Sequence, residues 1–139
     1  MGRLENLEEY EDKIEGIEEN AEEVEKEMEE LDQKISEIEN AIEKISEDQE
    51  VQEELNQKKS EYKEKKSEKE IEKQNLISEI ENVEEELNGD IEINDNSANV
   101  LSELSSIGED ISEAQRIVES RSATLNEMKD RLNVLKNKL

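Results

Sequence analysis

Residues 7–45 read LEEYEDKIEGIEENAEEVEKEMEELDQKISEIENAIEKI, and this stretch decides the fold class. Apolar residues recur in it at alternating steps of three and four, which is the spacing that lines one face of a coiled-coil helix. The positions of this first seam are Leu7, Tyr10, Ile14, Ile17, Ala21, Val24, Met28, Leu31, Ile35, Ile38, Ile42 and Ile45. No polar residue interrupts the seam, so the pattern predicts a helix over residues 3–46.

A second seam with the same spacing lies near the end of the chain and predicts a helix over residues 98–139. Its members are Val100, Leu104, Ile107, Ile111, Ala114, Val118, Arg121, Leu125, Met128, Leu132, Leu135 and Leu139. Arg121 is the one polar member. Its long side chain is expected to reach solvent or to pair with a carboxylate of the first helix, and the alternative is a contact with a partner protein.

The residues between the two seams are rich in Lys and Glu and predict a polar helix over residues 47–88. Two breaks are expected around this helix. Ser46-Glu47-Asp48-Gln49 matches the capping-box pattern and predicts a weak break after the first helix. Asn88-Gly89, followed by a cluster of Asp, Asn and Ser, predicts a loop over residues 88–97, because Gly suits the residue that closes a helix.

We therefore predict a single all-α domain over residues 1–139, folded as an elongated antiparallel coiled coil. One arrangement has three helices of about 40 residues running up, down and up. The other has one long helix over residues 3–88, with the helix over residues 98–139 folded back along it. Charge favours the first, because it places the basic stretches 58–73 and 116–138 beside the acidic stretch 22–43.

Composition excludes several kinds of site and partner. The 139 residues include 43 Asp and Glu, 18 Lys and Arg, and no His or Cys, and the net charge is −25. Thiolate or imidazole sites for zinc, haem or iron–sulfur clusters therefore cannot form, and we expect no metal, no cofactor and no enzymatic activity. The acidic charge argues against direct binding of nucleic acid or of an anionic membrane. We expect a cytoplasmic protein, because no signal-peptide pattern or membrane-length apolar run is present.

The function that this pattern favours is a protein-interaction module, such as an adaptor, a spacer or a partner subunit, that presents acidic helical faces to another protein. The partner is expected to offer a basic or helical docking surface. A homo-oligomer is also possible, since Ile at both kinds of seam position favours more than two strands. The candidate partner contacts are Leu101 and Ile117, which widen the second seam, together with Arg121, Tyr10 and Tyr62.

Two other functions stay open. The acidic surface could imitate nucleic acid and inhibit a DNA- or RNA-binding protein, because 25 net charges on a bundle of roughly 60 Å approach the charge spacing of duplex DNA. In size and texture the chain also resembles the helical partner proteins of type VII secretion effectors. It carries no Trp-x-Gly, and no acidic residue follows Tyr10 or Tyr62 by four positions.

Overall fold

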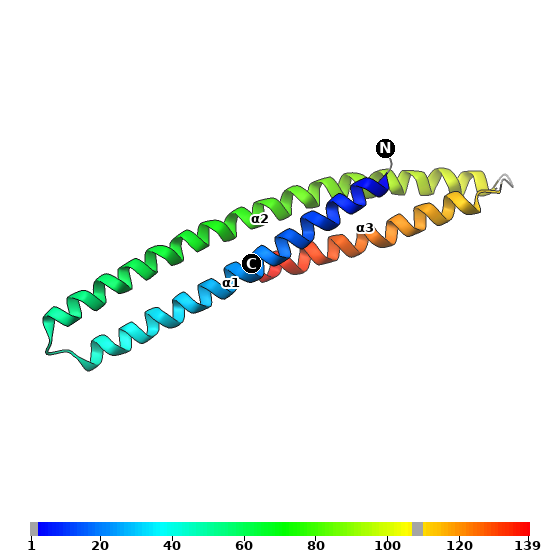
Figure 1. The fold of residues 1–139 in the computed structure, drawn as a ribbon. Helices are drawn as coiled ribbons and strands as arrows, with labels where there is room; N and C mark the ends of the chain where they lie inside the picture. Colours follow the sequence, from blue (N-terminus) through cyan, green and yellow to red (C-terminus); the bar gives the residue numbers. More distant parts are fainter. Residues whose placement is uncertain (1–2, 107–109) are drawn as a thin grey trace. The chain divides into compact units, whose positions relative to one another are not determined.

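The structure, a computed structural model, describes residues 3–106 and 110–139. These described residues form three α-helices and contain no β-strand. The helices are α1 (Arg3–Lys44), α2 (Gln49–Ser106) and α3 (Ser112–Lys138) (Figure 1). The prediction of an all-α protein built from three packed helices is confirmed.

The turn between α1 and α2 falls where the sequence predicts the first break. Helix α1 ends at Lys44 and α2 begins at Gln49. Asp48, rather than Ser46, caps the new helix, because its Oδ1 accepts a hydrogen bond of 3.3 Å from the backbone N–H of Val51. The alternative of one unbroken helix over residues 3–88 is wrong.

The predicted loop over residues 88–97 is also wrong, because α2 runs through this stretch without interruption. The reason is that its polar residues continue the buried face of α2 at the same three-and-four spacing. Asp90 and Asn94 follow Leu87 on this face, and both are buried. Tyr10 donates a hydrogen bond of 2.6 Å from its hydroxyl to Asp90 Oδ2, and Asn94 Nδ2 donates to the carbonyl oxygen of Val118 at 3.1 Å. These partners offset the cost of burying polar groups, so the stretch stays helical.

The second turn therefore lies later than predicted, and the helix expected over residues 98–139 is wrong. Val100 and Leu104 belong to α2. The rest of the described second seam belongs to α3, except for Ile111, which precedes this helix, and Leu139, which follows it. Ile107 lies outside the described residues. At the start of α3, Asp110 Oδ1 accepts hydrogen bonds from the backbone N–H and the hydroxyl of Ser112, and these bonds lower the pKa of the Asp110 carboxyl group.

The chain divides into two compact units. The three-helix unit comprises residues 1–18 and 77–139, so that the start of α1 packs with the second part of α2 and with α3. The largest fully buried side chains of the described residues all belong to it, namely Ile14, Ile80, Leu87 and Leu132. The most completely buried large side chains of the described core therefore lie in this unit.

Polar contacts fix the directions of the helices in the three-helix unit. Arg131 of α3 hydrogen-bonds Glu11 Oε2 at 2.6 Å and also Glu18, both on α1, and these two carboxylates raise the pKa of its guanidinium. Lys136 of α3 lies 3.8 Å from Glu81 of α2. Because Asn94 contacts Val118 while Glu81 contacts Lys136, α2 and α3 run antiparallel, as do α1 and α2, and the predicted up-down-up order is confirmed.

The two-helix unit comprises residues 19–76 and pairs the rest of α1 with the first part of α2. Here α1 supplies the apolar side of the seam, including the buried Val24, Leu31 and Ile35. The facing positions of α2, by contrast, are mostly polar. The half-buried residues on this face of α2 are Gln52, Leu55, Lys59, Tyr62, Lys66, Lys69 and Lys73.

The half-buried lysines of α2 explain how its polar first part packs on the apolar seam of α1. Their aliphatic stems cover the seam of α1, while their ammonium groups reach acidic residues that flank it. Lys59 lies 3.3 Å from Glu39, Lys66 lies 2.6 Å from Asp32, and Lys69 pairs with Glu27. Hydrogen bonds to these carboxylates raise the pKa values of Lys66 and Lys69, and Lys69 lowers the pKa of Glu27. The predicted placement of the basic stretch 58–73 beside the acidic stretch 22–43 is confirmed. The same placement of the stretch 116–138 is wrong, because Arg131 pairs with Glu11 and Glu18, which precede residue 22.

The continuity of α2 can be tested at Gly89. Gly89→Ala is expected to raise the free energy of unfolding by about 1 kcal/mol, because Gly costs roughly that much relative to Ala inside a helix. An added Cβ at this position meets no other atom within 4 Å, and the same is true of Gly16 in α1, which supplies the control. Urea unfolding followed by circular dichroism measures both variants. If residue 89 instead closed a helix in the left-handed conformation, Gly89→Ala would lower stability while Gly16→Ala still raised it.

Candidate functional site

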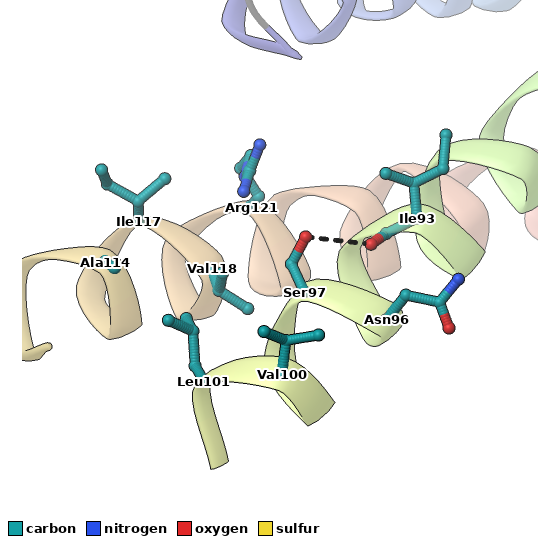
Figure 2. Close-up of a pocket in the computed structure, with 9 residues that line it drawn as sticks. All are labelled: Ile93, Asn96, Ser97, Val100, Leu101, Ala114, Ile117, Val118 and Arg121. Atoms are coloured by element: carbon teal, nitrogen blue, oxygen red, sulfur yellow. Dashed lines mark hydrogen bonds between the residues drawn. The ribbon is translucent and has the colours of Figure 1, made fainter. Parts of the chain in front are cut away.

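A groove of about 530 Å³ lies in the three-helix unit, between the last turns of α2 and the first turns of α3 (Figure 2). Its volume is within the range of ligand and peptide pockets. The groove is lined by Ile93, Asn96, Ser97, Val100, Leu101, Ala114, Ile117, Val118 and Arg121. It therefore brings together three of the predicted contact residues, Leu101, Ile117 and Arg121.

The apolar side chains of the groove are unusually exposed for a helical seam. Val118 is buried and forms the floor, whereas Ile93, Val100 and Ile117 are 44%, 55% and 49% exposed. In Figure 2, Ile93 on α2 and Ile117 on α3 extend to the same side of the helix pair. Scattered exposed apolar residues are ordinary on protein surfaces, but a contiguous patch of them is typical of an interaction site.

The groove continues the surface on which α1 packs. Leu7, the first residue of α1 whose side chain is described, borders a small cavity of about 10 Å³ together with Ile93, Asn94, Arg121, Leu125 and Asp90. Two of these residues, Ile93 and Arg121, also line the groove. The groove thus begins where Leu7 packs and extends along the same pair of helices toward Leu101 and Ala114. Among the described residues, α2 and α3 alone line it.

Arg121 stands at the end of the groove that is nearest to Leu7. Its side chain is half-buried, and its Nε atom is buried without a hydrogen bond to any described residue. The pairing with a carboxylate of the first helix that the sequence suggests is not formed within the described part of the chain. A guanidinium carries five N–H donors and cannot lose its charge, so an unpaired one beside an apolar floor favours an acceptor from outside.

The helix segments that carry the groove are acidic in sequence, although none of the residues that line the groove is Asp or Glu. Residues 77–106 of α2 contain nine Asp and Glu and no Lys or Arg. On α3, Arg116 is already paired with Glu113 at 3.1 Å. Within the part of the chain that the structure describes, the groove therefore has an apolar floor and a cation without an ion-pair partner, Arg121, at its end. The exposed carboxylates of Glu92 and Asp95 belong to residues that neighbour the lining residues Ile93 and Asn96 in the chain.

Comparisons with known proteins add no function to this geometry. No family model, curated protein or solved structure matches the chain. None of the helices in residues 3–106 and 110–139 has an apolar stretch sufficient to span a bilayer. The cytoplasmic location stays a prediction.

Neither tyrosine is among the residues that line the groove. Tyr10 is 6% exposed and hydrogen-bonds Asp90 in the core of the three-helix unit, which gives it a packing role there, and its contact with a partner stays a prediction. Tyr62 belongs to the two-helix unit, where the ammonium groups of Lys34 and Lys65 lie 5.4 and 5.7 Å from the centre of its ring. It is half-buried there and serves the packing of that unit.

Sequence reasoning misses Ile93 and the exposure of Val100. Ile93 falls in the stretch predicted as a loop, and the heptad spacing puts Val100 on the buried seam. A signal is present, however. Ile93 and Val100 are seven residues apart and flank the face formed by Asp90, Asn94 and Leu101, so a heptad pattern that accepts polar seam residues gives α2 a second apolar stripe.

Proposed function

We propose that the protein is a non-enzymatic interaction module, an adaptor, spacer or partner subunit, that docks a helix of another protein in the groove between α2 and α3. The observation that supports this proposal is the exposed patch of Ile93, Val100 and Ile117, which continues the surface where α1 packs. An apolar helix face laid into such a groove buries the patch and completes a three-helix arrangement.

The charge of each unit gives less support to nucleic-acid mimicry. The three-helix unit has 22 acidic and 8 basic residues, a net charge of −14, and its part of α2 extends for about 45 Å. The two-helix unit has 21 acidic and 10 basic residues, a net charge of −11, over about 42 Å. Each unit thus has one net charge per roughly 3 to 4 Å, against one per about 1.7 Å in duplex DNA. Mimicry and the type VII partner function stay predictions without a supporting observation.

The proposal is tested with a double variant of the groove, Val100→Gln with Ile117→Gln. Wild-type and variant proteins are immobilised and used to capture binders from a nuclease-treated lysate of the source organism. The matched control is Ile71→Gln with Val134→Gln, which changes two side chains that are 62% and 66% exposed and lie outside the groove. All four positions are exposed, so the free energy of unfolding is expected to change by less than about 0.5 kcal/mol per substitution.

The expected result is a partner that wild-type and control proteins capture and that the groove variant loses by at least tenfold. Such a partner should persist at high salt, because apolar burial is not screened. A partner that all three proteins retain equally would contradict the groove as the docking site. A partner that added DNA or RNA and high salt release from all three would indicate mimicry instead.

A further inference from the structure

We infer that the groove between α2 and α3 accepts a basic amphipathic helix that carries one carboxylate aligned with Arg121. This inference rests on the proposed docking function and adds the chemistry of the partner. It follows from three observations: the length of the groove, the acidic residues of the helix segments that carry it, and the buried Nε of Arg121, which has no hydrogen-bond partner among the described residues.

The length of the groove sets the size of the occupant. On α2 the exposed stripe runs from Ile93 to Val100, which is two helical turns or about 10 Å. On α3 the lining from Ala114 to Arg121 has the same length. A helix of two to three turns that presents apolar residues at steps of three and four therefore covers the exposed patch, in the position that α1 occupies beside Leu7.

The charge of the two helix segments that carry the groove favours a basic partner over a second copy of the chain. The described residues between 93 and 121 include five acidic and two basic residues. Two copies docked through this surface would bring like charges together around a small apolar patch, which disfavours the contact. Lys or Arg residues that flank the apolar stripe of a partner helix would instead meet exposed carboxylates of α2 such as those of Glu92 and Asp95, which neighbour the lining residues Ile93 and Asn96 in the chain.

Arg121 requires one negatively charged residue on the otherwise basic partner helix. Its Nε is buried and unpartnered among the described residues, and no described carboxylate forms an ion pair with its guanidinium. In Figure 2 the side chain of Arg121 extends to the same side of the helix pair as Ile117. An Asp or Glu of the partner helix that faces Arg121 would accept charge-assisted hydrogen bonds from its guanidinium in a partly desolvated site. This contact would fix the register of the partner helix in the groove.

The test uses designed peptides of about 18 residues, which is long enough for appreciable helix formation. Each carries Leu at alternating steps of three and four and is flanked by Lys, and a single Glu is moved in turn through the positions beside the Leu stripe. Fluorescence anisotropy measures the Kd of each peptide for the full-length protein. One Glu position is expected to bind tightest, and its Glu→Gln counterpart should bind roughly 10-fold or more weaker. A peptide in which Glu replaces the flanking Lys residues should bind no more tightly than this Gln counterpart.

The decisive control is the same pair of peptides on the Arg121→Gln protein. Glu and Gln peptides should bind this variant with equal Kd values, because the carboxylate has lost its partner. An unchanged preference for the Glu peptide on Arg121→Gln would overturn the inference about Arg121 while leaving the docking groove intact. If the Kd values did not change on the Val100→Gln, Ile117→Gln variant, or if no peptide bound the wild-type protein, the proposed docking function itself would fail.

Discussion

Replacing Leu132 by Ala is expected to lower the free energy of unfolding of the three-helix unit by about 2 to 5 kcal/mol. The Leu132 side chain is 0% exposed, so its removal loses buried apolar area and leaves a cavity among three helices. Tyr62→Phe provides a suitable background. With two Tyr and no Trp in the chain, this change leaves Tyr10 as the one strong fluorophore, and Tyr10 reports on the three-helix unit.

The control for this prediction lies two residues away on the same helix. Val134 is 66% exposed, so Val134→Ala is expected to change stability by no more than about 0.5 kcal/mol. Equal losses for the two variants would mean that α3 is rotated about its axis, because only the present orientation buries residue 132 and exposes residue 134.

Tyr10→Phe is expected to lower the free energy of unfolding by about 1.5 to 3 kcal/mol. The substitution keeps the ring but removes the hydroxyl that donates a hydrogen bond of 2.6 Å to Asp90, whose side chain is buried. A buried carboxylate that loses a donor keeps its desolvation cost. Urea unfolding followed by circular dichroism measures the change.

Two further variants separate the effect of losing the hydrogen bond from any change in the packing of the ring. Tyr62→Phe, in the two-helix unit, is expected to be nearly neutral, because the ring that Lys34 and Lys65 approach is retained. Combining Tyr10→Phe with Asp90→Leu should recover most of the loss, since an apolar pair of similar shape needs no hydrogen bond. A cost for Tyr10→Phe as small as that for Tyr62→Phe would show that the Tyr10–Asp90 contact does not stabilise the core.

The first seam shows how far sequence periodicity reaches. Every one of its positions, from Leu7 to Ile45, is buried or half-buried in the structure. This success has a simple cause: the seam is apolar throughout, so the removal of apolar surface from water favours the same face at every position. The break near Ser46 is predicted as well, because the periodic spacing slips there just before a capping residue.

The second part of α2 shows where the same reasoning fails. Asn88, Gly89 and Asp90 are turn formers by local preference, yet tertiary hydrogen bonds to Tyr10 and Val118 hold this stretch in a helix. The partners of Asp90 and Asn94 lie 80 and 24 residues away, so no local window of sequence contains this information. The true turn, before Ser112, is hidden by seam spacing that continues across it by coincidence.

The groove is predictable in part, for the same reasons. Leu101, Ile117 and Arg121 widen or interrupt an apolar face in the sequence, and the structure places them together. Ile93 cannot be assigned to this surface as long as a loop is predicted around it. Tyr10 is a candidate contact because aromatic residues are common at interfaces, but its burial depends on contacts that only the folded chain reveals.

The measurement that tests the docking proposal most directly is site-specific photocrosslinking in cells of the source organism. A benzoylphenylalanine at position 100 or 117 stands in the groove, and one at position 134 stands on an equally exposed part of α3 outside it. The proposal predicts that positions 100 and 117 form an adduct with the same protein, through a helical segment rich in Lys or Arg, and that position 134 does not. Equal adducts at all three positions, or an adduct at position 134 alone, would contradict the groove as the site where this protein meets its partner.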